Sequence, residues 1–198
     1  MSDEKAPDFE FRVKDHTYWH GSARLFSVTE VLDLVGLIPS FCKEEERAHE
    51  GKAAHFACQL EDEGDLREDT VHPVIVPYLE AWRRFKNECG FKPEIIEKPF
   101  FREDIGLAGT PDRLGFAFEK PVIIDIKTGQ PQAYWAWQLA GYSLLTEAGR
   151  LRYSVQLTKE GKYKLHRYDN PARDRSIFQS ALVIARVKGE LYGSNGNR

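Results

Sequence analysis

The chain has 198 residues, a length that suits one compact domain with a sizeable hydrophobic core. Hydrophobic residues make up 41% and charged residues 30% of the sequence, which excludes a disordered chain, and no apolar run is long enough to span a membrane. The net charge of -3 argues against a protein that coats DNA with its whole surface, although the first half is acidic and the second half basic.

The termini and cysteines indicate the cellular setting. The polar, acidic start MSDEKAPDFE shows no secretory signal, so we expect a cytoplasmic protein. The three cysteines, Cys42, Cys58 and Cys89, have no metal-type spacing and cannot all pair with one another. We therefore expect free, mostly buried thiols in a reducing compartment.

The first part of the chain predicts mainly helices. Residues 10–26 indicate a short hairpin or irregular strands. Helices are then predicted over residues 27–36, 41–63 and 74–89. Ser27 and Glu30 have capping-box spacing for the first of these, Ser40 is a candidate cap for the second, and Gly90 ends the third.

The second part alternates between strands and helices. Strands are predicted over residues 94–101, 107–118, 121–127, 152–158 and 163–168, and helices over residues 131–148 and 170–192. Asn170 is the expected cap of the last helix, with Pro171 at its first position. This order predicts an α/β fold in which helices flank a central mixed sheet.

The strand over residues 121–127 carries Asp125 and Lys127 within an apolar run. Because alternate residues of a strand share a face, the two side chains are neighbours about 7 Å apart along the strand. One explanation is an ion pair that faces water on an edge strand. The other explanation involves Asp112, which follows a Gly-Thr-Pro turn and would approach Asp125 if the two strands pair as a hairpin.

Two carboxylates in a partly buried place repel each other unless one binds a proton or a cation lies between them. Mg²⁺ is commonly held by one or two carboxylates, with waters and substrate phosphates as its other ligands. Lys127 would then orient or deprotonate a water, or stabilise the charge that develops on the phosphate. Asp112, Asp125 and Lys127 together predict hydrolysis of a phosphodiester.

Five short motifs resemble, in their order along the chain, the RecB-like branch of the PD-(D/E)-x-K nuclease superfamily, which includes lambda-type exonucleases. The motifs are Gly51 with His55, Glu97, Pro111-Asp112, Asp125-Ile126-Lys127, and Gln138 with Tyr142. The resemblance covers roughly residues 27–160. It implies a restriction-endonuclease-like core with the order αβββαβ, preceded by an N-terminal helical region.

The resemblance implies one nuclease domain over residues 1–198. Its expected parts are a mostly helical part over 1–90, a catalytic sheet core over 91–168 and a C-terminal helix over 169–198. Some relatives bind an iron–sulfur cluster through four cysteines, and the sequence has three, so we expect no cluster. DNA, as a duplex with ends or a single strand, is the implied partner, with a single-strand annealing protein and further copies of the chain as additional candidates, and no membrane.

The implied activity is a metal-dependent DNA nuclease, an exonuclease rather than a sequence-specific endonuclease, that serves recombination, repair or phage DNA processing. The implied metal ligands are His55, Asp112, Asp125 and the carbonyl of Ile126. Mg²⁺ or Mn²⁺ is the expected ion, and a histidine ligand favours Mn²⁺. The implied catalytic residues are Asp112, Asp125, Lys127 and Glu97, and the implied substrate-binding residues are Gln138, Tyr142 and Arg113.

Several alternatives stay open from the sequence. A lone histidine such as His55 is commonly an ordinary packed residue, although Gly51 inside the same helix suggests a close approach by another group. Glu97 would hold a second metal or face solvent. Gln138 and Tyr142 share a helix face that would either point at the site or pack in the core. The alternative functions are a non-catalytic DNA-binding subunit, an endonuclease, an RNA nuclease and a small-molecule phosphodiesterase.

Overall fold

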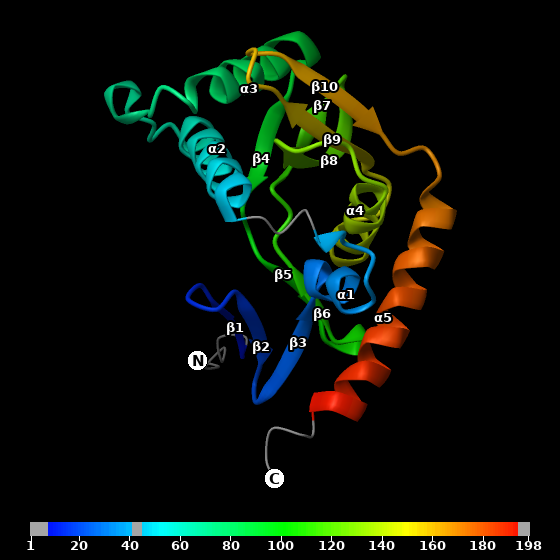
Figure 1. Ribbon diagram of the computed structural model, residues 1–198. Helices are drawn as coiled ribbons and strands as arrows, with labels where there is room; N and C mark the ends of the chain where they lie inside the picture. The colour runs from blue at the N-terminus through cyan, green and yellow to red at the C-terminus, as the bar shows by residue number, and fades with distance from the viewer. Residues whose placement is uncertain (1–7, 41–44, 194–198) are drawn as a thin grey trace, which may run out of the picture.

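Two five-stranded mixed sheets organise residues 8–40 and 45–193, the part of the chain that the computed structural model describes (Figure 1). The central sheet has the strand order β10-β9-β8-β7-β4, and β8 and β9 are parallel while its other neighbours are antiparallel. Its strands are β4 (Lys92–Ile96), β7 (Arg113–Ala117), β8 (Lys120–Lys127), β9 (Leu151–Leu157) and β10 (Tyr163–Arg167). This confirms the predicted central mixed sheet.

A second sheet has the strand order β1-β2-β3-β6-β5. Its strands are β1 (Phe9–Arg12), β2 (Thr17–His20), β3 (Ala23–Ser27), β5 (Phe100–Arg102) and β6 (Leu107–Gly109). The hairpin expected over residues 10–26 is present, but it continues through a third strand that pairs in parallel with β6. The sequence did not predict this sheet, because β5 and β6 are short and lie within longer predicted strands.

Two predicted strands are each divided between the sheets. The strand expected over residues 94–101 breaks at Glu97, whose φ of 46° lies in the left-handed region, and continues as β5 after Pro99. The strand expected over residues 107–118 breaks at Pro111, which has no backbone N–H for a sheet ladder. The backbone N–H of Glu97 donates to the carbonyl of Asp112 at 3.1 Å, so the two crossings lie side by side.

Helices cover both faces of the central sheet. They are α1 (Val28–Leu34), α2 (Glu45–Glu63), α3 (Val76–Cys89), α4 (Tyr134–Leu145) and α5 (Pro171–Gly193). Helices α2 and α3 pack on one face, and α1, α4 and α5 on the other (Figure 1). The chain order α3-β4-β7-β8-α4-β9 is the expected αβββαβ order, with β5 and β6 inserted after β4.

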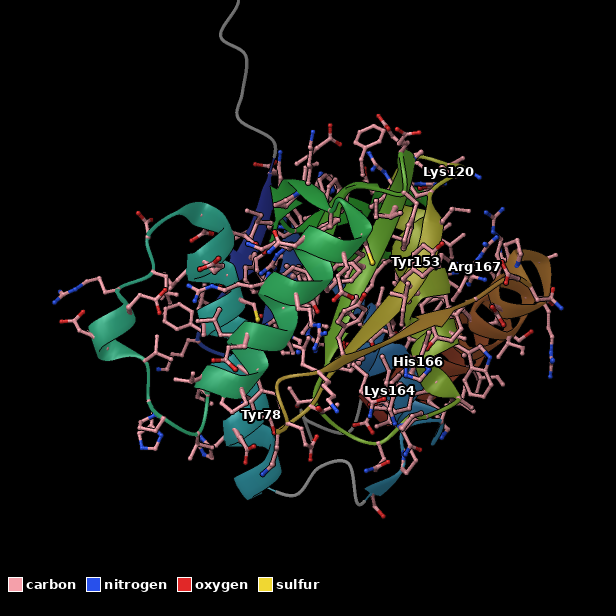
Figure 2. All side chains as sticks on the ribbon, turned by 90° about the horizontal axis from the view of Figure 1, so that it is seen from above. Tyr78, Lys120, Tyr153, Lys164, His166 and Arg167 are labelled. Carbon is pink, nitrogen blue, oxygen red and sulfur yellow. The ribbon has the colours of Figure 1, made fainter. Side chains whose placement is uncertain are left out.

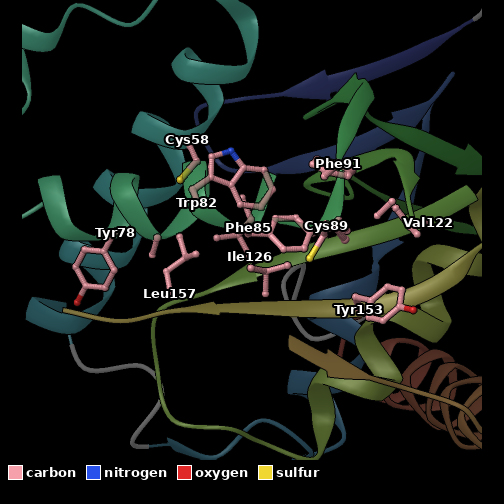
Figure 3. Packing of buried hydrophobic residues seen from close by; sticks show 14 of the residues in the cluster. Cys58, Tyr78, Trp82, Phe85, Cys89, Phe91, Val122, Ile126, Tyr153 and Leu157 are labelled. Carbon is pink, nitrogen blue, oxygen red and sulfur yellow. The ribbon is translucent and has the colours of Figure 1, made fainter. Parts of the chain in front are cut away.

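Strand β8 is buried on both faces because it is the middle strand of the central sheet. Ile126 and its alternate neighbours pack against Trp82 and Phe85 of α3 (Figure 3), whereas Ile123 packs among the side chains of α4 and α5. Burying each such side chain contributes about 1.5–3 kcal/mol to stability. The alternative of a water-facing ion pair on an edge strand is therefore wrong for Asp125, which is 2% exposed.

Most predicted helix ends are confirmed. The Ser27 hydroxyl accepts from the backbone N–H of Glu30 at 3.0 Å, and the Glu30 carboxylate accepts from Ser27 N–H in return, which completes the capping box. Asn170 caps α5 by accepting from Arg173 N–H at 3.2 Å. Helix α3 ends at Gly90, whose φ is 59°.

Helix α4 ends at Leu145 rather than at residue 148, because Thr146 is extended and its hydroxyl donates to the Tyr142 carbonyl at 3.1 Å. The predicted start of the second helix at residue 41 lies outside the described residues, so the Ser40 cap stays a prediction.

Strand β10 forms one edge of the central sheet. Strand β10 carries Lys164 and Arg167 at exposed positions (Figure 2), charges that discourage pairing with another chain.

Of the cysteines, Cys58 and Cys89 are buried free thiols, and Cys42 lies outside the described residues. None of the helices in the described ranges is long and apolar enough to cross a membrane.

Gly115 in β7 lies directly against the backbone of β4. A Cβ atom at this position would lie 2.1 Å from the carbonyl oxygen of Lys92. We expect Gly115→Ala to lower the free energy of unfolding by about 3 kcal/mol, since neither strand can move aside without losing its pairing. Urea denaturation measures this change. Gly129→Ala is the control, because a Cβ there meets nothing within 4 Å, and equal losses in both variants would contradict the described pairing.

Candidate active site

Asp112 lies at the crossing between β6 and β7, at the end of the central sheet. Its Oδ2 atom accepts from the backbone N–H of Ile126 at 2.6 Å and lies 3.5 Å from Nδ1 of His55. The residue is 8% exposed. The antiparallel pairing of β7 with β8 therefore brings Asp112 to the strand that carries Asp125, as the sequence predicted.

His55 comes to this point on helix α2. Gly51 lies one turn earlier, and a Cβ atom there would lie 3.1 Å from the Thr128 hydroxyl oxygen, so the glycine permits close approach of the helix to the end of β8. Burial lowers the pKa of His55, although Asp112 and a hydrogen bond to the backbone of Ile126 oppose the shift. The neutral imidazole that burial favours is the form that binds a metal.

Glu97, His55 and Asp112 form a candidate metal centre. Each offers a ligand atom, and these atoms lie within 4.8 Å of one another. Burial, and then the charge of Asp112, raise the pKa of Glu97 to about 8 despite the neighbouring Arg113. Two carboxylates and an imidazole suit Mg²⁺ or Mn²⁺. The structure thus places Glu97 beside His55 and Asp112. The sequence had left open whether Glu97 faces solvent instead.

Asp125 and Lys127 form a buried ion pair beside this cluster. Nζ of Lys127 lies 2.8 Å from Oδ2 of Asp125, and it donates to Oε1 of Gln138 at 2.9 Å. Burial raises the pKa of Asp125 to about 7, with Lys127 opposing and Asp112 adding to the rise. Burial favours neutral Lys127, but the two aspartates outweigh it and raise the pKa of Lys127. Asp125 thus fixes the lysine, and its place among the metal ligands stays a prediction.

Gln138 and Tyr142 lie on the face of α4 that meets the site. The Gln138 amide N–H donates to the Tyr142 hydroxyl at 3.3 Å, while its oxygen accepts from Lys127. Both residues are buried, at 7% and 6% exposure. Tyr142 also packs in the core against Gly109. This helix face therefore both points at the site and packs in the core. Gln138 contacts the site through its hydrogen bond with Lys127.

Arg113 does not occupy the position expected of a phosphate contact. Its side chain is 0% exposed, and its guanidinium pairs with Oε1 of Glu97 at 3.0 Å and donates to the Asp112 carbonyl at 2.6 Å. The substrate-binding assignment is thus corrected, because a fully buried guanidinium has no surface to offer DNA. Arg113 instead holds two members of the metal cluster in place.

Asp62 completes this network and escaped the sequence analysis. Its carboxylate lies 2.8 Å from Nε of Arg113, both side chains being fully buried, and it also accepts from Trp82 Nε1 at 3.0 Å. No motif singles it out. The available clue was its spacing of seven residues from His55, which puts both on one face of α2.

A cleft of about 640 Å³ opens onto these groups. Its walls are helix α2, His16 in the turn between β1 and β2, and residues 128–135 after β8. Its lining includes His55 and Glu97 of the metal cluster and Lys127. The candidate centre is therefore accessible to a substrate, although most of its polar groups are buried.

A protein family and solved structures are similar to this chain. A model of the PD-(D/E)XK nuclease superfamily matches residues 26–187. The chain is similar to the crystal structure of an alkaline exonuclease (LHK-Exo) from Laribacter hongkongensis, at 17% identity and a TM-score of 0.44, covering 86% of this chain and 92% of the other. For LHK-Exo in complex with dAMP the values are 16%, 0.40, 87% and 95%. No curated protein matches the sequence.

The metal cluster can be tested without any substrate. We expect calorimetric titration to detect Mn²⁺ binding by the wild-type protein, its abolition by Asp112→Asn, and a loss of affinity of about tenfold or more in Glu97→Gln, because each change removes a charged ligand. Glu94→Gln is the matched control, since Glu94 is an exposed glutamate on β4. Unchanged affinity in Glu97→Gln would remove Glu97 from the ligand set.

The buried Asp62–Arg113 pair makes a prediction about stability. Asp62→Ala leaves the Arg113 charge buried with one partner fewer, so we expect the free energy of unfolding to fall by about 3–5 kcal/mol. Glu68→Ala, which removes an exposed carboxylate that pairs with Arg83, should cost less than about 1 kcal/mol. Guanidinium denaturation of both variants decides the matter, and a small loss for Asp62→Ala would argue against a structural role for the pair.

Proposed function

The chain belongs to the PD-(D/E)XK nuclease superfamily, and from this premise we propose that it is a divalent-metal-dependent DNA exonuclease of the RecB-like branch. The observation that carries the proposal is the position of Lys127. Its ammonium group is held by Asp125 and Gln138 and lines the same cleft as His55 and Glu97. A fixed cation next to a candidate metal centre is the arrangement that phosphodiester hydrolysis requires.

The chemistry assigns each group a task. Hydrolysis forms a bond between a water oxygen and the phosphorus and breaks one P–O bond, and overall the water loses one proton while the leaving oxygen gains one. His55, Glu97 and Asp112 would hold a divalent ion, and such an ion would supply Lewis-acid stabilisation of the charge on the phosphate. Lys127 stabilises the same charge from its fixed position. Because its ammonium already pairs with Asp125, we assign Lys127 this electrostatic task rather than removal of a proton from water.

Two features support action at DNA ends rather than sequence-specific cutting. The segments that border the cleft, residues 13–16 and 128–133, are short connections and offer no long arm to read a duplex groove. The cleft itself has the volume typical of a site for a small ligand. Both features fit the terminal nucleotides of a strand better than the full width of a duplex.

The competing functions are less well supported. A non-catalytic DNA-binding subunit would be expected to have lost part of the site, whereas Asp112, Asp125 and Lys127 are all present and mutually connected through the end of β8. An endonuclease or an RNA nuclease would use the same groups, and substrate comparison separates them. A single-strand annealing partner, self-association and a role in recombination, repair or phage DNA processing stay predictions.

The test is cleavage of end-labelled linear duplex and closed circular DNA with Mg²⁺, Mn²⁺ or EDTA. We expect loss of the linear DNA with either ion, none in EDTA, and survival of the circles. Lys127→Ala should lower the rate about 10²–10³-fold, because it removes a charge aimed at the transition state.

Lys120→Ala is the matched control for this experiment. Lys120 begins β8 at an exposed position (Figure 2), whereas Lys127 ends the same strand at the cleft. The control should retain wild-type activity. Nicking of circles would replace the exonuclease by an endonuclease, and retained cleavage by Asp125→Ala would refute the proposed site. DNA binding without any cleavage would favour the non-catalytic subunit.

A further inference from the structure

An exposed aromatic ring stands at the cleft and serves neither the core nor the metal cluster. Phe56 follows His55 on α2, lines the cleft and is 58% exposed. The small side chains around it on the helix, Ala54, Ala57 and Cys58, are the ones that pack inward. A single exposed phenylalanine is unremarkable on a surface, so its place beside the metal cluster is what calls for an explanation.

Lys52 lies one helical turn before Phe56, so the two side chains are neighbours on the same face of α2. Both line the cleft. His16 also lines the cleft, and burial lowers its pKa, with the charge of Lys52 lowering it further. The imidazole is held by ring contacts with Phe11 and Tyr18, at centroid distances of 5.0 and 5.7 Å. A cation and an exposed ring thus lie together on α2, and a supported imidazole lines the same cleft.

The other rings near the cleft are occupied by the protein itself. Trp135 is 2% exposed and packs edge-on against His166 at 5.7 Å. Tyr134 and Trp137 pack against the core formed by α1, α4 and α5. Among the phenylalanine, tyrosine and tryptophan rings that line the cleft, Phe56 is the exposed one.

We propose that Phe56 and Lys52 form a subsite for one unpaired nucleotide of a single-stranded DNA end, with the ring stacked on the base and the ammonium group bound to a backbone phosphate. This subsite rests on the proposed function, since it feeds the strand to the metal cluster. Bases inside a duplex have both faces covered by neighbouring pairs, and only an unpaired or terminal base offers a face to a ring. The subsite therefore selects single-stranded ends over duplex interiors.

The first test measures stacking directly, with a single-stranded oligonucleotide that carries 2-aminopurine at its end, in EDTA so that metal-dependent cleavage does not occur. We expect its fluorescence to change on binding to the wild-type protein. Phe56→Ala and Phe56→Leu should lose this change and bind about tenfold more weakly, within the range for one stacked base. The leucine variant keeps an apolar side chain, so a folding defect is separated from a loss of stacking.

Phe116→Ala is the matched control, because Phe116 is an aromatic residue on β7, 41% exposed and outside the cleft lining. It should bind like the wild type. For the cation, Lys52→Ala should weaken single-strand binding and reduce the number of counterions released by about one, read from the salt dependence of affinity. Lys120→Ala should leave that slope unchanged.

Each outcome decides one proposal separately. Unchanged fluorescence and affinity in Phe56→Ala would overturn the subsite, as would equal affinity of the wild type for single-stranded and blunt duplex DNA of one sequence. Metal-dependent cleavage without a Phe56 effect would leave the proposed nuclease intact and remove the subsite. A Phe56-dependent fluorescence change in a protein that cleaves nothing would keep the subsite and remove the catalytic proposal.

Discussion

The buried guanidinium of Arg113 is the constraint on which the site depends. A positive charge without solvent is tolerated when anions surround it, and here Asp62 and Glu97 supply the charge while the carbonyl of Asp112 supplies a further acceptor. The same bonds hold the carbonyl of Asp112 and the carboxylate of Glu97, two members of the candidate metal centre. The groups that compensate the charge of Arg113 therefore also fix the geometry of the candidate metal centre.

The sequence predicted those features that depend on residues close together in the chain. The apolar strand over residues 121–127, the capping box at Ser27 and the glycine that ends α3 are local features, and each is where its residues indicated. The pairing of β7 with β8 was predictable because the connection between them is short. The family motifs then related His55 and Gln138, which are distant in sequence, to the same strand end.

What the sequence could not indicate depends on tertiary contacts. Arg113 follows Asp112, a candidate metal ligand, so phosphate binding is a reasonable expectation from the sequence, and the burial of Arg113 becomes clear only once α2 and Asp62 lie against it. No motif singles out Phe56, and its exposure becomes clear only once the neighbouring small side chains of α2 are seen to fill the buried face of the helix. The second sheet was hidden because Glu97 and Pro111 interrupt runs that read as continuous strands.

The double crossing between the sheets has a mechanical consequence. The chain leaves the central sheet after β4 and returns before β7, and a hydrogen bond from Glu97 to Asp112 joins the two passages. A tilt of one sheet against the other would have to be absorbed by the backbone dihedrals of these two residues, each of which contributes a carboxylate to the metal cluster. The distance between the carboxylates of Glu97 and Asp112 therefore depends on how the two sheets are aligned. A well-formed candidate centre requires that the sheets do not shift against each other.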